Sequence, residues 1–263
     1  MDLAASDVGS GPRAVVLLHG QPGSGADLGA LADALAPQMR VIVPDRPGYG
    51  RSGGQAVGFE ENARRVVGLL DGLGVAGATL AGHSWGAGVA LAAARLAPER
   101  VDALALISPV TPGGRLGLVD RVLANPLLGP PLLRAGFGLV GRSLSLRPVR
   151  RLAAAALSGL RYEDVLATAA QWRTAPVWRS FFTEQRALVE ELPALSPALG
   201  SIDVPATVVT GTRDRFASPR NAAELADALP RGTLVEVEGA GHLLPQQRPG
   251  IVARAILDLG TRR

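Results

Sequence analysis

Residues 78–86 read Ala-Thr-Leu-Ala-Gly-His-Ser-Trp-Gly, which sets Ser84 inside a Gly-x-Ser-x-Gly pattern. A pattern this short also occurs by chance, so its surroundings decide what it means. The apolar run 78–81 predicts a buried strand, and residues 86–96 predict a helix. A tight turn between them requires small residues two positions to either side of Ser84, here Gly82 and Gly86, because neighbouring backbone passes close. The segment therefore predicts a serine hydroxyl that points outward at the carboxyl edge of a sheet.

Apolar runs and amphipathic stretches alternate on both sides of this segment. A continuous apolar run predicts a strand buried on both faces, whereas apolar residues every three or four positions predict a helix. Such alternation is typical of an α/β fold with a mostly parallel, doubly wound sheet covered by helices. The predicted strands are 14–18, 40–43, 78–81, 101–107, 206–210 and 233–237, and the predicted helices are 27–36, 59–73, 86–96, 218–229 and 246–259.

The alternation stops at Pro109 and resumes near residue 206. Residues 111–197 contain Leu-rich and Ala-rich helical patterns that are interrupted by prolines, and no strand run. We therefore expect a core domain made of residues 1–110 and 198–263, with a helical insertion of about 85 residues over 111–197.

The insertion differs from the core in composition. It carries 11 arginines and 6 acidic residues, and it holds six of the ten aromatic residues of the chain. One interpretation is that the rings fill contacts between helices while the arginines face solvent. The other is that the insertion is a cap whose inner face forms an apolar substrate pocket. The pocket candidates are Phe137, Trp172, Trp178, Phe181 and Phe182.

A serine hydroxyl needs a base before it acts as a nucleophile, and His242 is the candidate. It lies in a glycine-rich loop just after the predicted strand 233–237. We expect the ring of His83, which adjoins the serine, to point elsewhere, and His19 to fix its own loop. The base needs a carboxylate that holds its tautomer. Asp214 follows the strand 206–210 and so reaches the same sheet edge.

Backbone N–H groups near the serine are expected to form an oxyanion hole. The N–H of Trp85 lies at the start of the helix after the serine, where the amides point toward developing negative charge. A second donor is expected from the loop 19–23 after the first long strand. The N–H of Gln21 is the simplest choice there, because Pro22 has none.

Composition excludes several classes of protein. The absence of cysteine excludes disulfides, iron–sulfur clusters and thiolate zinc sites. The three histidines lie far apart, so we expect no metal and no cofactor. The net charge is only +4 and the basic residues, all arginine, are scattered, which does not favour nucleic acid. Neither a signal peptide nor a membrane-spanning run is visible, so we expect a cytoplasmic protein with a small-molecule substrate.

Three blocks of the sequence resemble the α/β-hydrolase superfamily, in particular its lidded serine-hydrolase branch of esterases, haloperoxidase or perhydrolase-like enzymes and C–C bond hydrolases. The chain order Ser84, Asp214, His242 is also the order of that superfamily. The resemblance covers the chain except the insertion, which lies where family caps lie. Residues 1–8 leave room for at most one edge strand, where relatives often have a longer hairpin. The blocks are His19-Gly20-Gln21-Pro22-Gly23, Asp45-Arg46-Pro47-Gly48-Tyr49-Gly50-Arg51-Ser52 and Gly82-His83-Ser84-Trp85-Gly86-Ala87-Gly88.

The leading hypothesis is a serine esterase-like hydrolase that cleaves an ester, lactone or amide of a medium-sized apolar substrate through an acyl-enzyme. A serine nucleophile argues against epoxide hydrolases and haloalkane dehalogenases, which attack through a carboxylate. The alternatives are a C–C bond hydrolase, a perhydrolase, a proline iminopeptidase-like enzyme, and a non-catalytic ligand-binding protein on the same fold. Weak association with a membrane surface, through residues 116–146 and the arginines at 142, 147, 150 and 151, is a further hypothesis.

Overall fold

A seven-stranded sheet in the order β1-β3-β2-β4-β5-β6-β7 organises the chain. Strands β2 to β7 run parallel, and β1 pairs antiparallel with β3. The computed structural model describes residues 3–114, 116–156 and 177–259. The strands are β1 (Ala5–Val8), β2 (Ala14–Leu18), β3 (Arg40–Pro44), β4 (Ala78–His83), β5 (Val101–Ile107), β6 (Ala206–Gly211) and β7 (Gly232–Val237).

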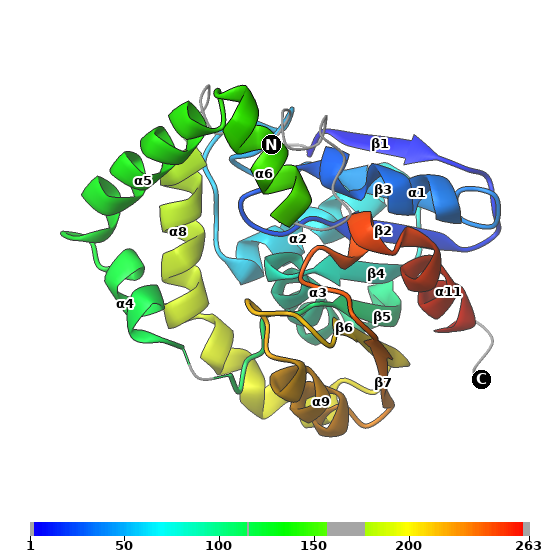
Figure 1. Cartoon of the computed structure of the whole chain (residues 1–263). Helices are drawn as coiled ribbons and strands as arrows, with labels where there is room; N and C mark the ends of the chain where they lie inside the picture. The colour runs from blue at the N-terminus through cyan, green and yellow to red at the C-terminus, as the bar shows by residue number, and fades with distance from the viewer. Residues whose placement is uncertain (1–2, 115, 157–176, 260–263) are drawn as a thin grey trace.

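Helices cover both faces of this sheet (Figure 1). Helices α2, α3 and α9 pack on one face, and α1 and α11 pack on the other. The helices of the core are η1 (Gly25–Leu28), α1 (Gly29–Leu35), α2 (Phe59–Gly72), α3 (Trp85–Leu96), η2 (Pro98–Arg100), α9 (Pro219–Ala228), α10 (Leu244–Gln247) and α11 (Pro249–Leu259).

Burial on both faces explains why the central strands are continuously apolar. On β2, Val16 and Leu18 contact the layer of α2 and α3, whereas Val15 and Leu17 contact the layer of α1 and α11. All four side chains are fully buried. Neither face of the strand meets water, so alternation with polar residues is absent. The fold class predicted from the sequence is confirmed.

The edge strand and the last helix refine the predictions from the sequence. Strand β1 is the single edge strand for which residues 1–8 have room. The prediction of a single helix over 246–259 is wrong. The structure has two helices, α10 and α11, which are separated at Arg248, where φ is −141° and ψ is 51°. The following Pro249 accounts for the break, since a proline disfavours helical backbone at the residue before it.

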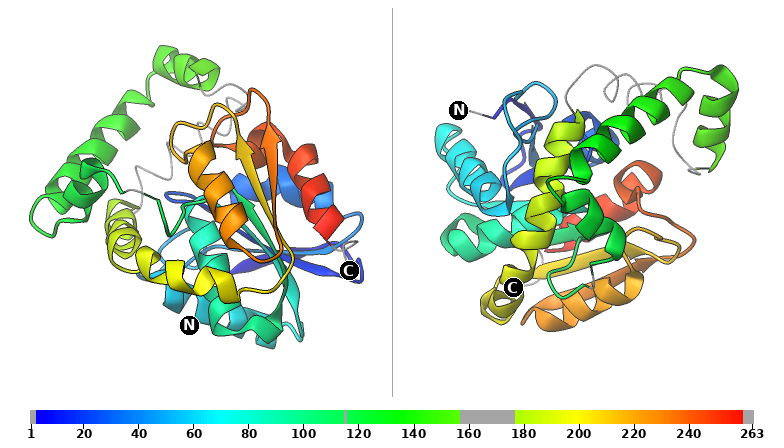
Figure 2. Two further views of the ribbon diagram at one scale, coloured as in Figure 1. Left: turned by 90° about the horizontal axis from the view of Figure 1, so that it is seen from below. Right: turned by 90° about the vertical axis from the view of Figure 1, so that its left-hand side faces the viewer.

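The segment between β5 and β6 contributes helices that stand to one side of the core (Figures 1 and 2). We call these the inserted helices: α4 (Leu118–Ala124), α5 (Gly129–Ser143), α6 (Arg147–Ala156) and α8 (Val177–Glu190). Both α4 and α5 pack on α8, which continues into the 3-10 helix η3 (Leu192–Ser201) and so back to the core. Among the described helices, none is both long and apolar enough to cross a bilayer.

The sheet order places one crossover beside β2. The chain leaves β2 for β3 on one side and returns to β4 on the other, so β2 and β4 enclose the point where the strand order reverses. In open α/β sheets, ligands bind at the carboxyl ends of the strands beside this reversal. The loop 19–23 follows β2, and Ser84 follows β4. The topology therefore brings these two segments together.

Candidate active site

Ser84 occupies the turn between β4 and α3 with φ 52° and ψ −115°, a conformation that few residues other than glycine adopt. Its N–H donates to the carbonyl of Ile107 (2.9 Å), and its own carbonyl accepts the N–H of Val110 (3.2 Å). A Cβ on Gly86 would collide with backbone carbonyls of Leu18 and His19. The Gly-x-Ser-x-Gly pattern thus fits a strained turn against which the end of β2 passes closely.

Ser84, His242 and Asp214 lie in one hydrogen-bonded row. The Nε2 atom of His242 is 3.0 Å from Ser84 Oγ, and Nδ1 is 2.8 Å from Asp214 Oδ2. Because a carboxylate only accepts hydrogen bonds, Nδ1 carries the proton and Nε2 accepts the serine hydroxyl. The Asp214 side chain is fully buried, whereas that of His242 is 17% exposed. The structure therefore brings together three residues that the sequence places up to 158 positions apart.

The carboxylate of Asp214 is held on both oxygens. Its Oδ1 accepts the backbone N–H groups of Phe216 (2.8 Å) and Ala217 (2.9 Å), while Oδ2 faces His242. Burial tends to raise the pKa of Asp214, but the hydrogen bond and charge of His242 and the two N–H donors outweigh it. The pKa consequently lies below the usual range, and the group is ionised at neutral pH.

His83 holds the loop that carries His242. Its Nε2–H donates to the backbone carbonyl of His242 (2.9 Å), and the two ring centres are 5.1 Å apart. Burial, together with the nearby charge of His242, lowers the pKa of His83 to about 3. The ring is therefore neutral, and it supports the backbone of the His242 loop.

The loop after β2 lies against the serine. A Cβ on Gly20 would be 3.1 Å from both Ser84 Cβ and His83 Nδ1, so only glycine fits there without displacement. The next residue is Gln21, the expected second donor of an oxyanion hole. The expected first donor, Trp85, is the first residue of α3, where N–H groups have no partner inside the helix.

A neutral histidine and a buried arginine fix this loop. The N–H of Arg46 donates to His19 Nε2 (2.9 Å), and His19 Nδ1–H donates to the carbonyl of Gly20 (2.8 Å). The Arg46 guanidinium also donates to that carbonyl (2.9 Å). Burial, and then the charge of Arg46, hold the pKa of His19 well below its usual value. His19 therefore fixes the loop, as expected from the sequence.

A buried ion pair that was not predicted from the sequence joins Arg46 to Glu184 of α8, and both side chains are at most 1% exposed. The Tyr49 hydroxyl also donates to Glu184 (2.8 Å), and the guanidinium lies 4.5 Å from the ring centre of Trp85. Burial raises the pKa of Glu184 above its usual range. The spacing of the sequence gives one indication that Glu184 is buried. It lies four residues from Ser180 and four from Leu188, and all three share the buried face of α8.

The adjacent residue of α8, Gln185, makes a second connection to the core. The Gln21 side-chain amide donates to Gln185 Oε1 (3.1 Å), and Gln185 Nε2 donates to Asp120 Oδ1 of α4 (3.1 Å). The indole N–H of Trp85 donates to the backbone carbonyl of Glu184 (3.2 Å). Two consecutive residues of α8 thus hold the side chains of Gln21 and Trp85.

The described pocket candidates make contacts among the inserted helices. Phe137 of α5 and Phe181 of α8 meet edge to face at 5.5 Å, and Phe182 lies beside Gly129. Trp178 is paired with the guanidinium of Arg179, 5.2 Å from its ring centre. Trp172 lies outside the described residues.

Phe216 is an aromatic residue near the site that the sequence analysis did not single out. Its ring centre is 5.4 Å from that of His242, and the residue is 83% exposed. It lies two residues after Asp214, so the loop that carries the acid also places an apolar ring beside the histidine.

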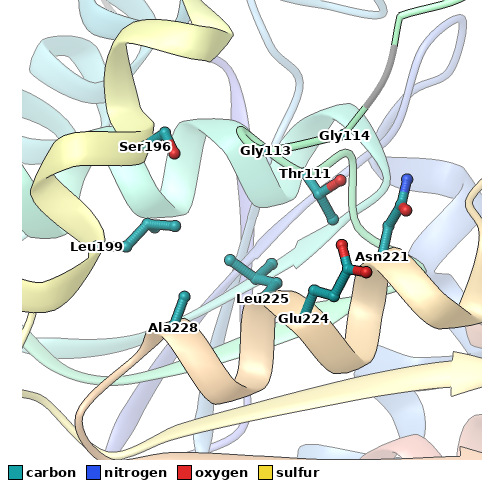
Figure 3. A pocket seen from close by; sticks show the side chains of 9 residues that line it. All are labelled: Thr111, Gly113, Gly114, Ser196, Leu199, Asn221, Glu224, Leu225 and Ala228. Carbon is teal, nitrogen blue, oxygen red and sulfur yellow. The ribbon is translucent and has the colours of Figure 1, made fainter.

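A small cavity of about 100 Å³ lies where η3 and α9 meet the loop after β5 (Figure 3). Its walls combine Leu199 and Leu225 with polar groups of Thr111 and Asn221. Neither Ser84 nor the residues bonded to it line this cavity, so it is distinct from the hydrogen-bonded row.

The fold and the loops at its carboxyl edge are those of the α/β-hydrolase class. The chain belongs to the alpha/beta hydrolase family, whose model matches residues 15–255. The 2-hydroxy-6-oxononadienedioate/2-hydroxy-6-oxononatrienedioate hydrolase of Burkholderia vietnamiensis is 30% identical over 96% of this chain and 88% of its own. Haloalkane dehalogenase 2 of Mycobacterium tuberculosis is 27% identical over 96% and 89%. A thermophilic esterase from Thermogutta terrifontis has a TM-score of 0.79 at 25% identity, covering 99% of this chain and 93% of its own.

Proposed function

We propose that this hydrolase uses Ser84 as a nucleophile, His242 as general base and Asp214 as the acid that orients the base. The observation that carries the proposal is the row of hydrogen bonds from Ser84 Oγ to His242 Nε2 and from His242 Nδ1 to Asp214 Oδ2. A serine at the strained turn after a central strand, with this row behind it, is the arrangement that acyl transfer requires.

In this mechanism, Ser84 Oγ attacks the substrate carbonyl while His242 Nε2 takes the hydroxyl proton. Asp214 stabilises the imidazolium that forms, and its lowered pKa keeps it ionised for that purpose. The N–H groups of Trp85 and Gln21 stabilise the oxyanion. His242 then donates its proton to the leaving group, and water hydrolyses the acyl-enzyme by the same steps in reverse.

The proposed substrate is an ester, lactone or amide with a medium-sized apolar part. We propose that the inserted helices act as a cap that selects this part, with Phe137, Trp178, Phe181 and Phe182 contributing apolar surface. The bonds of Glu184 and Gln185 support this role, because they attach α8 directly behind the loop beside Ser84.

A fluorophosphonate probe tests the mechanism. We expect stoichiometric labelling of the wild-type chain at Ser84, mapped by peptide mass, and no labelling of Ser84→Ala. A p-nitrophenyl ester series from acetate to palmitate then tests the substrate class. A maximum at medium chain length supports an apolar pocket, whereas a preference for acetate without dependence on chain length contradicts it.

A second candidate is hydrolysis of a carbon–carbon bond. It is favoured by the Burkholderia relative, which is named as a hydrolase of 2-hydroxy-6-oxononadienedioate and 2-hydroxy-6-oxononatrienedioate. The match to that relative covers 96% of this chain. The substrate would be a 2-hydroxy-6-oxo-dienoate, and loss of its absorbance would report turnover. Turnover of this compound with kcat/KM above that of every ester in the series would make it the better assignment.

A further inference from the structure

Large apolar side chains are exposed mainly on the inserted helices and the connections between them. Of the 14 such residues exposed in the described chain, nine lie between residues 118 and 152. A large exposed apolar patch on a protein marks a site of interaction with another protein or with a membrane. Six of them, exposed by 49% to 82%, form what we call the outer stripe: Leu118, Val119, Leu127, Leu128, Leu132 and Leu139.

Three of the six residues of the outer stripe follow one side of α5, beginning at the residue before the helix. Leu128 lies four residues before Leu132, and Leu139 lies seven residues after it, so the three share a helix face. The opposite face holds the buried Leu133 and the ring of Phe137, which contacts α8. Helix α5 therefore has two apolar faces, one packed on α8 and one directed away from the core (Figures 1 and 2).

Positive charge predominates around the outer stripe, and Asp120 is the only acidic residue within residues 116–156. The sequence contains no acidic residue between Asp120 and Glu163. Asp120 itself is occupied, because its carboxylate accepts the N–H of Gly117 and the amide of Gln185. Five exposed arginines lie in the described part of this run: Arg121, Arg134, Arg142, Arg147 and Arg151.

Exposed leucines bordered by arginines complement an anionic lipid surface. Apolar side chains enter the boundary between headgroups and acyl chains, and each nearby arginine gains from the negative surface potential. The guanidinium also binds phosphate oxygens in a bidentate manner. A second copy of the chain is a poorer partner, since twofold pairing through this face would set the arginines against one another.

We propose that the outer stripe and its bordering arginines form a docking surface for a membrane rich in anionic phospholipid. The surface belongs to α4, α5 and the start of α6, and the helices lie in the headgroup region without crossing the bilayer. The proposal is independent of the catalytic mechanism, because binding to vesicles is measured without turnover.

Co-sedimentation with phospholipid vesicles tests the proposal. We expect the wild-type chain to pellet with vesicles that contain phosphatidylglycerol and to stay in solution with phosphatidylcholine alone. Binding should weaken as salt is raised, because the headgroup charge is screened. A chain that stays in solution with both vesicles, or binds both equally, overturns the proposal.

Two variants separate the apolar and the charged contributions. Leu127→Gln with Leu139→Gln should lower partitioning onto anionic vesicles by roughly tenfold or more. Arg147→Gln with Arg151→Gln should lower it about 25-fold, since each arginine near the surface is worth about fivefold. Their matched controls are Leu96→Gln with Ile251→Gln and Arg220→Gln with Arg231→Gln, which lie outside the inserted helices and should bind as the wild type.

Folding and self-association are checked on the same samples. All variants should keep the wild-type unfolding midpoint, because the altered side chains are exposed. Equal losses in the control variants would overturn the proposal. A dimer seen by light scattering, lost in Leu127→Gln with Leu139→Gln and accompanied by no vesicle binding, would also overturn it and assign the face to a second copy.

Discussion

The core and the inserted helices hold their functional groups in different ways. In the core, Ser84, Asp214 and His242 each follow a parallel strand, and backbone hydrogen bonds fix each loop. The inserted helices reach this region through two adjacent residues of α8, Glu184 and Gln185. The sheet therefore dictates where the proposed catalytic residues lie, whereas a few side chains decide how α8 lies against the core.

Members of one fold family carry out several reactions. The relatives resemble this chain over most of its length, yet their names describe a 2-hydroxy-6-oxononadienedioate/2-hydroxy-6-oxononatrienedioate hydrolase, a haloalkane dehalogenase and an esterase. A scaffold that fixes the loops at the strand ends tolerates change in the insertion between β5 and β6. Substitutions in the core should therefore test the reaction, and substitutions on α8 should test how the inserted helices are attached.

Replacement of the serine should have the largest effect. Ser84→Ala is expected to lower kcat by roughly 10³-fold or more, because the proposed residues act as a unit. The unfolding midpoint should be unchanged, since Oγ contributes little to packing. Steady-state kinetics and circular dichroism measure the two quantities. Activity retained in a folded variant would remove the covalent mechanism.

Asp214→Asn should lower kcat by on the order of 10²- to 10⁴-fold. The amide is able to donate to the imidazole, which favours the wrong tautomer, and it lacks the charge that stabilises the imidazolium. Asp203→Asn, before β6, and Asp227→Asn, in α9, serve as controls with near-normal kcat. If all three variants behave alike, the acid is misassigned. Asp45 would be tested next, although its carboxylate is engaged by the N–H groups of Gly25 and Arg51.

Glu184→Gln should destabilise the protein by about 3 kcal/mol or more, because it leaves the buried charge of Arg46 without its partner. The control is Glu190→Gln on the same helix, which breaks only an exposed pair with Arg186 and should cost less than about 1 kcal/mol. Urea unfolding compares the two variants. Equal costs would mean that the buried pair does not anchor α8.

His83→Gln should make the free energy of unfolding less dependent on pH. The folded pKa is about 3 and the unfolded pKa about 6.5, so between these values only the unfolded state binds the proton. Stability from this group is complete above about pH 6.5 and is lost as the pH falls. Between pH 7 and pH 5 the wild type should lose about 2 kcal/mol more than the variant.

The glutamine keeps a donor for the carbonyl of His242. Urea unfolding of both proteins at both pH values measures this difference, because His19 and His242 are present in each protein. Parallel losses in wild type and variant would show that His83 takes up its proton in the native state.

Gln185→Leu should have the smallest effect, a fall in kcat of about fivefold with little change in KM. The variant loses the hydrogen bond from Gln21, worth about 1 kcal/mol, which positions the loop beside Ser84. Thr183→Val, at an exposed position of the same helix, should have normal kinetics. A rise in KM at constant kcat would instead place Gln185 in substrate binding.

Local sequence patterns were enough to predict the strands of the sheet and the loops that carry the proposed catalytic residues. Continuous apolar runs indicated strands buried on both faces. The glycines near Ser84 indicated a tight turn with neighbouring backbone so close that there is no room for larger side chains. Because parallel strands end at one edge, the residues after β4, β6 and β7 were expected near one another. These inferences depend on local composition and on a repeated geometry, which is why one sequence suffices for them.

The attachment of α8 to the core, in contrast, became apparent only from the folded chain. Arg46 and Glu184 are 138 residues apart, and the block of residues 45–52 that contains Arg46 does not indicate its partner. The role of His83 depends likewise on a loop 159 residues away. The sequence also did not tell which apolar face of α5 is covered, because both faces have helical spacing. Which distant residues pair, and which face of a helix is covered, depends on the packing of elements far apart in the sequence. No local pattern records it.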